Sequence, residues 1–101
     1  MALTDAGHAK MLAGDWQGAL PLLQQAVSKL QGTGRIEEAW ADYNLASTRL
    51  HLGQCTGVVD LLKTSEHIQG HRTEIDDARK QAKQQCGKGG GGNGEGNGQG
   101  D

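Results

Sequence analysis

Apolar residues recur at steps of three and four along residues 39–62, which is the spacing of one face of a helix. The face is formed first by Ala41, Leu45, Thr48 and Leu52, and beyond Gly53 it restarts with Val58, Leu61 and Leu62. A glycine at a helix end supplies the left-handed residue that stops the helix. The stretch is therefore predicted to form a helical hairpin. One hairpin cannot bury its own apolar stripe and needs a second hairpin to stack on.

A related pattern lies 39 residues earlier in the chain, where Gly14-Asp15-Trp16 occupies the place of Gly53-Gln54-Cys55. The other pairs that match at this offset are Gly7 with Ala46, Ala19 with Val58, Leu23 with Leu62, and Ala26 with Ser65. Small residues fall where two helices cross closely, and large ones fill the grooves between helices. Two stacked hairpins are therefore expected, with Trp16 packed at the first turn.

The pattern predicts five helices, over residues 3–13, 16–30, 36–52, 55–68 and 74–85. In the second helix, Pro21 is expected to cost a backbone bond or cause a kink, unless this helix begins only near residues 19–20. Thr73 and Asp76 resemble a capping box at the start of the fifth helix. That helix is mostly charged, and its thin apolar stripe is typical of a helix that caps a repeat array. The stripe consists of Ile75, Ala78 and Ala82.

Residues 87–101 contain nine of the 17 glycines and no large apolar side chain. Such a segment cannot bury enough surface to offset the entropy of ordering, so it is expected to be a disordered Gly-rich tail, either an inert terminus or a linker. The predicted domain covers residues 1–86. It divides into repeat 1 at about 3–30, repeat 2 at about 36–68 and a capping helix at about 74–86.

The first hairpin resembles the tetratricopeptide repeat (TPR), through Gly7, Gly14-Asp15-Trp16, Ala19 and Ala26. The second hairpin departs from the motif at Cys55, Val58 and Ser65, and neither repeat ends in proline. The 39-residue period also exceeds the usual ~34, with the surplus assigned to residues 31–35. The resemblance implies an all-α, TPR-like helical repeat of two helix-turn-helix hairpins plus a C-terminal capping helix. It also implies binding of an extended protein or peptide ligand on the concave face.

In TPR modules the first helix of each repeat lines this concave face. The resemblance therefore assigns the peptide groove to His8, Met11, Leu12, Tyr43, Asn44, Ser47, Leu50 and His51. Asn44 stands where many TPRs have an asparagine that holds a peptide backbone or a C-terminal carboxylate. Thr4 and His8 fill the places of the lysines that clamp such a carboxylate in some TPRs, which argues against that variant. Alternatively, Tyr43 and Leu50 pack on the neighbouring repeat, and the two histidines are simply solvated.

Cys55 and Cys86 are predicted to meet. The stretches from Cys55 to residue 68 and from residue 73 to Cys86 are both 13 residues long, about 20 Å each as helix. If these helices are antiparallel neighbours, both sulfurs arrive at the same end, and a disulfide would place the domain in an oxidising compartment. Two free thiols remain an alternative. A metal site of His51, Cys55 and Cys86 is another, with His67 and His71 at the wrong end and no CxxC or HxxxH spacing to support it.

The composition argues against several classes of function. A formal net charge of −2 gives no electrostatic reason to expect nucleic acid or an anionic membrane as partner. No apolar run approaches the ~18 residues of a membrane span, and the start of the chain lacks the features of a signal peptide. Phosphate-binding loops, nucleophile–base pairs and HExxH motifs are missing, so neither catalysis nor a cofactor is expected. Met1 begins almost inside a repeat, which favours a piece of a longer chain.

A closer resemblance covers Ala41 to the tail. The run ADYNLASTRLHLGQC, then LLKTSEHIQGHRTEIDDARKQAKQQC and the Gly-rich end, is similar to the C-terminal segment of some bacterial membrane-anchored serine/threonine protein kinases. It implies an extracytoplasmic sensor or interaction region, with no direct membrane contact in this segment. The rival interpretations are a structural spacer or dimerisation module without a peptide ligand, which allows a homodimer, and a cytoplasmic TPR adaptor with a Cys/His metal site.

Overall fold

The computed structural model describes residues 3–86, and within this range all regular secondary structure is helical. The five helices are α1 (Leu3–Leu12), α2 (Trp16–Leu30), α3 (Ile36–His51), α4 (Val58–Gln69) and α5 (Thr73–Cys86). The all-α prediction is therefore confirmed. The predicted disordered tail at 87–101 lies outside the described residues. None of the helices in residues 3–86 combines the length and the apolar character needed to cross a membrane.

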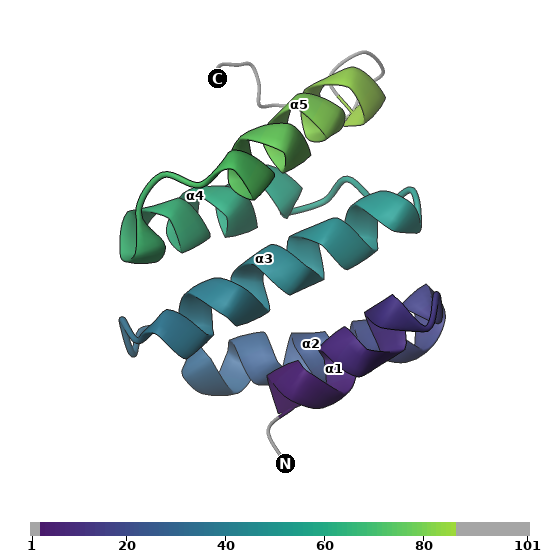
Figure 1. The fold of residues 1–101 in the computed structure, drawn as a ribbon, viewed down its shortest axis with the longest axis vertical. Coiled ribbons are helices and arrows are strands. Elements are labelled where there is room, and N and C mark those ends of the chain that lie inside the picture. The colour runs from purple at the N-terminus through teal and green to yellow at the C-terminus, as the bar shows by residue number, and fades with distance from the viewer. Residues whose placement is uncertain (1–2, 87–101) are drawn as a thin grey trace.

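Helix α3 is the centre of the arrangement, because it contacts all four other helices (Figure 1). The α1–α2 hairpin packs on one side of α3, and α4 followed by α5 packs on the other. Helix α5 also touches α3, so it closes the stack at the end away from α1. This central position explains why α3 is the longest helix and carries the most buried residues.

Local signals set most of the helix boundaries. Gly14, at a φ of 78°, ends the first helix, and Asp15 caps α2 by accepting a hydrogen bond from the Gly18 amide at 2.9 Å. This cap starts α2 at Trp16, so the alternative start near residues 19–20 is wrong. Pro21 lies inside the helix on its exposed side, where it removes only the bond to the carbonyl of Gln17.

Helix α4 begins three residues later than predicted. Gly57 adopts a left-handed conformation with φ 75°, so residues 55–57 form a turn and Val58 is the first helical residue. Arg49 fixes this turn, because its Nη1 donates a hydrogen bond to the carbonyl of Thr56 at 2.6 Å. The predicted capping box of α5 is also wrong, since the Asp76 carboxylate pairs with His71 instead.

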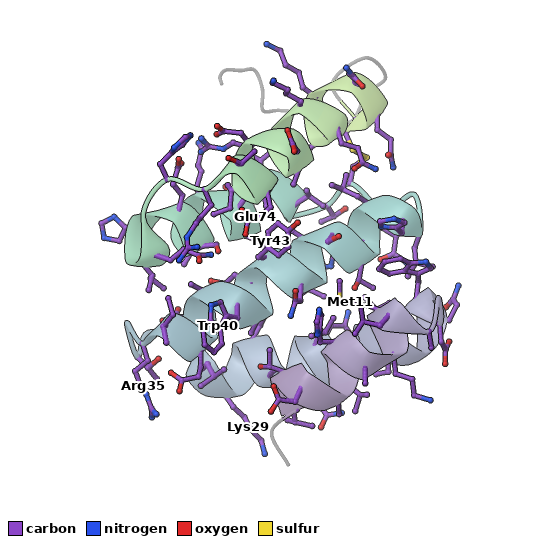
Figure 2. The ribbon with its side chains drawn as sticks, in the orientation of Figure 1. Met11, Lys29, Arg35, Trp40, Tyr43 and Glu74 are labelled. Atoms are coloured by element: carbon purple, nitrogen blue, oxygen red, sulfur yellow. A yellow bond between two sulfur atoms is a disulfide. The ribbon has the colours of Figure 1, made fainter. Side chains whose placement is uncertain are left out.

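The core divides into two clusters that meet at α3. The larger cluster joins α3, α4 and α5 and consists of Ala46, Leu50, Val58, Leu62, Ile75, Ala78 and Ala82. The smaller joins α2 and α3 through Ala19, Leu23 and Leu45, with Met11 packed against it from α1 (Figure 2). Gly7 lets α1 approach α2 closely, since a Cβ there would lie 2.6 Å from Leu23 Cγ. The expectation that small residues mark close helix crossings is met at this position.

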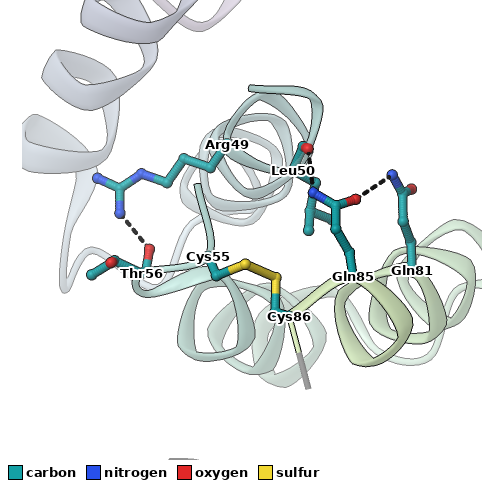
Figure 3. Close-up of a disulfide and its surroundings, with 7 residues drawn as sticks. All are labelled: Arg49, Leu50, Cys55, Thr56, Gln81, Gln85 and Cys86. Atoms are coloured by element: carbon teal, nitrogen blue, oxygen red, sulfur yellow. Dashed lines mark hydrogen bonds between the residues drawn. A yellow bond between two sulfur atoms is a disulfide. The ribbon is translucent and has the colours of Figure 1, made fainter. Parts of the chain in front are cut away.

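Helix α5 is attached by a covalent bond as well as by packing. Cys55 and Cys86 form a disulfide with a Cα–Cα distance of 5.8 Å (Figure 3). The predicted pairing is confirmed, although Cys55 lies in the turn before α4 and not in the helix. Beside it, Gln85 Nε2 donates a hydrogen bond to the carbonyl of Leu50 at 2.7 Å. Neither cysteine is a free thiol, which contradicts the alternative of two free thiols and leaves no thiolate ligand for a metal site of His51, Cys55 and Cys86. Within residues 3–86 no group of His, Cys, Asp and Glu side chains gathers as metal ligands.

Candidate functional site

A groove of about 310 Å³ lies between α1, α3 and the start of α5. Its lining comes from α1 through Thr4, Asp5 and His8, from α3 through Trp40, Tyr43 and Asn44, and from the α4–α5 region through Gln69, Arg72 and Glu74. Three of the eight residues predicted for the groove, His8, Tyr43 and Asn44, are therefore brought together. Helix periodicity explains this, because Trp40, Tyr43 and Asn44 are three and four residues apart and share one face of α3.

Trp40 is the most unusual side chain of this groove. It is 49% exposed, although a tryptophan offers a large apolar surface that folding normally buries. Tyr43 lies further along the same side of α3, next to Glu74 (Figure 2). Exposed aromatic side chains in a concave surface are typical of contact sites for another molecule.

Tyr43 is half-buried between the larger core cluster and the groove. Its burial raises the pKa of the phenol, and the nearby Glu74 and Asp77 carboxylates raise this pKa further. The hydroxyl therefore keeps its proton and remains available as a hydrogen-bond donor at any physiological pH. Asn44, also half-buried, adds an amide that can both donate and accept.

The charges in the groove are mixed. Asp5 and Glu74 carry negative charge, and Arg72 carries positive charge on the rim. Together with the amides of Asn44 and Gln69, these groups could form hydrogen bonds with the backbone of a peptide and ion pairs with peptide side chains of either charge.

The other predicted groove residues lie elsewhere. Leu50 is only 3% exposed and belongs to the core cluster of α3, α4 and α5, so it does not line the groove. Met11 packs inward on the α2–α3 cluster, and Leu12, 77% exposed, stands at the end of α1 away from the groove lining. Ser47 and His51 interact with each other through the Ser47 carbonyl, which accepts a hydrogen bond from His51 Nδ1 at 2.9 Å.

His51 also stacks on Trp16, with ring centroids 3.7 Å apart and planes within 8°. This contact joins the first hairpin turn to the C-terminal end of α3. Trp16 therefore packs at the turn, as predicted, and His51 serves as its platform rather than as a groove residue. A flat aromatic pair of this kind contributes to the attachment of one helix to the next.

The sequence carried a signal for one residue that was missed. Trp40 lies three residues before Tyr43 and four before Asn44, so helical spacing alone places it beside them. Arg72 and Glu74 carried no such signal, because their position depends on how α5 folds back over α3. No protein-family model, curated protein or solved structure matches this chain.

Proposed function

We propose that this chain is a non-catalytic, TPR-like module that binds a protein or peptide segment in the groove between α1, α3 and α5. The observation that carries the proposal is the exposed Trp40 beside Tyr43 and Asn44 in a concave surface. Aromatic side chains of this kind dominate the binding energy of protein interfaces, and amides nearby satisfy the polar backbone of an extended ligand.

The matched positions of the two hairpins support the TPR-like part of this proposal. At the 39-residue offset, both members of each pair are buried: Gly7 and Ala46, Ala19 and Val58, Leu23 and Leu62, and Ala26 and Ser65. The groove is lined mainly by α1 and α3, which are the first helices of the two hairpins, and by the region where α5 begins. Helix α5 follows the second hairpin, where the first helix of a third repeat would stand. The first helices of successive repeats line the surface on which TPR modules bind their ligands.

The disulfide supports an extracytoplasmic location, because disulfides persist in oxidising compartments. It agrees with the resemblance to the C-terminal region of bacterial membrane-anchored serine/threonine kinases. We therefore propose that the module is the sensing or interaction region of such a kinase, with the catalytic domain in another part of the parent chain.

The test is selection of binders from a displayed library of random short peptides, using the purified oxidised chain. Trp40→Ala and Asn44→Ala should each weaken the selected peptide about tenfold or more, as loss of an interface hot spot does. Leu12→Ala is the matched control, since it removes an exposed apolar side chain outside the groove and should leave affinity unchanged. All three variants should keep the melting temperature within a few degrees.

Two results would contradict the proposal. One is a library that yields no binder. The other is a binder whose affinity is the same for wild type and Trp40→Ala. In either case the spacer or dimerisation module becomes the better interpretation, and sedimentation of the oxidised chain would then separate a monomeric spacer from a homodimer.

A further inference from the structure

A second cavity, of about 330 Å³, lies between α2, α3 and α4. The α3 residues that line it are Glu38, Asp42, Leu45 and Arg49, whereas Trp40, Tyr43 and Asn44 line the groove described above. At 100° per residue these two sets lie on opposite faces of α3. The second cavity is therefore separate from the proposed peptide groove.

Asp42 is the residue in this cavity that the fold leaves unexplained. Its side chain is buried, with 3% of the residue exposed, and its Oδ2 atom has no hydrogen-bond partner within residues 3–86. It takes part in none of the four ion pairs formed among these residues. A buried carboxylate without a partner is unfavourable, and proteins normally pair such a group.

Glu38, one helical turn away, shows what a structural carboxylate looks like in this chain. It is also buried, but its oxygens accept hydrogen bonds from the amides of Gly32 at 3.0 Å and Gly34 at 2.8 Å. Glu38 thus holds the α2–α3 loop, and its burial is explained by that role. Asp42 has no comparable task, although it lies on the same face of the helix.

The cavity walls differ in chemistry from one end to the other. Glu38 and Asp42 contribute two carboxylates one turn apart on α3, Asp60 contributes a third from the first turn of α4, and Val27, Leu45 and Leu61 provide apolar walls. From α2 and the residue that follows it come Val27 and Gln31, neither of which is charged. Arg49, two helical turns from Asp42, bonds to the Thr56 carbonyl through Nη1, while its buried Nε has no partner within residues 3–86. Its positive charge disfavours a cation at that end, so a cation is favoured near Glu38 and Asp42.

We propose that this cavity binds a cationic group on an alkyl stem, a guanidinium or a primary ammonium, with the charge on Asp42 and the stem along Val27, Leu45 and Leu61. Such a ligand supplies the donors and the positive charge that Asp42 lacks, and its methylene groups match the apolar walls. The same chemistry exists in a free amine and in an arginine or lysine side chain of a partner.

The protonation of Asp42 gives this site a measurable signature. Burial, reinforced by the charge of Glu38, raises the pKa of Asp42 to about 7. Arg49 and Asp60 are the other charged groups that face the cavity, from α3 and α4 respectively. A cation binds the ionised carboxylate, so binding releases to the buffer the proton that the neutral form held. The affinity should therefore rise about tenfold from pH 6 to pH 8.

The probe is agmatine, a butyl stem with a guanidinium at one end and a primary ammonium at the other, titrated into the isotope-labelled full chain at pH 8 and followed by amide chemical shifts. The amides of Leu45, Leu61 and Thr64 should move, whereas butylurea, which has a butyl stem but carries no charge, should move none. Asp42→Asn should weaken agmatine at least tenfold. Asp5→Asn removes a carboxylate from the other groove and should leave agmatine binding unchanged.

A second measurement needs no variant. Calorimetry of agmatine binding to wild type at pH 7, in two buffers of different ionisation enthalpy, should show a net release of protons on binding, since the raised pKa of Asp42 keeps part of the carboxyl groups protonated near neutral pH. Absence of saturable shifts, binding that is equal at pH 6 and pH 8, or binding that Asp42→Asn leaves unchanged would each overturn the proposal.

The same titration identifies the source of the cation. Stronger binding of a capped Gly-Arg-Gly peptide than of agmatine indicates a basic side chain of a partner, and the reverse indicates a free amine. Trp40→Ala should leave agmatine binding unchanged. A failure of the cation site is therefore distinguishable from a failure of the peptide groove.

Discussion

Residues 16 and 55 occupy equivalent places in the two hairpin turns, yet they attach the next helix in different ways. Trp16, in the first turn, stacks on His51 at the C-terminal end of α3. Cys55, in the second turn, forms the disulfide with Cys86 at the C-terminal end of α5. The two turns thus perform the same task, one through an aromatic stack and the other through a covalent bond.

The difference follows from what each next helix can bury. Helix α3 is held from several sides, since it contacts all four other helices. Helix α5 is mostly polar and contributes only Ile75, Ala78 and Ala82 to the buried core cluster. A weak contact is sufficient at the first turn, because packing already fixes α3. At the second turn the disulfide compensates for the thin apolar stripe of α5.

The largest expected effect comes from breaking the covalent attachment. Reduction of the disulfide, which closes a loop across a separation of 31 residues, should lower the free energy of unfolding by about 4 kcal/mol on the chain-entropy model. Urea unfolding with and without reductant measures this change. The Cys55→Ser, Cys86→Ser double variant is the control. Its free energy of unfolding should equal that of the reduced wild type, and reductant should not change it.

Hydrogen exchange sharpens this prediction. The amides of α5 should lose protection on reduction, whereas those of α1 and α2 should change little, because they lie on the other side of α3. Equal loss along the whole chain would contradict a local role for the disulfide.

A smaller effect is expected at the close crossing of α1 and α2. Alanine favours a helix over glycine by about 1 kcal/mol, but at residue 7 its Cβ would lie 2.6 Å from Leu23 Cγ. Gly7→Ala should therefore lower the free energy of unfolding by about 1–2 kcal/mol through overpacking. The matched change in the other hairpin, Ala46→Gly, should cost about 1 kcal/mol for the opposite reason. A Gly7→Ala variant that is more stable than wild type would contradict this prediction, because it would show that α1 and α2 can move apart enough to accommodate the methyl group at little cost.

The smallest effect should come from the aromatic contact at the first turn. His51→Ala removes the stack on Trp16 and the bond to the Ser47 carbonyl, and should cost about 0.5–1.5 kcal/mol in thermal or urea unfolding. The loss should be clearly smaller than that caused by reduction. If the two losses are equal, the two turns contribute equally, and the contrast between them does not hold.

The groove shows where prediction from the sequence stops. Tyr43 and Leu50 are seven residues apart on α3 and share a helix face, so the sequence assigned both to the peptide groove. Helix α5 covers the C-terminal part of that face, where Gln85 bonds to the Leu50 carbonyl and Ile75 packs in the same core cluster. The part of this face that remains open is the part near Trp40, Tyr43 and Asn44. The local sequence pattern could not reveal which part α5 covers.

The sequence by itself predicted that there are five helices and that two of them cross closely at Gly7, and it favoured the pairing of Cys55 with Cys86 over free thiols or a metal site. Each of these depends on spacing along the chain, and helical geometry has a fixed rise and a fixed angle per residue. The tertiary structure alone decided which part of α3 stays open, which residues of α5 join the groove and that Asp42 is buried without a partner. These features depend on how helices distant in sequence pack against one another, and packing is set by many weak contacts together.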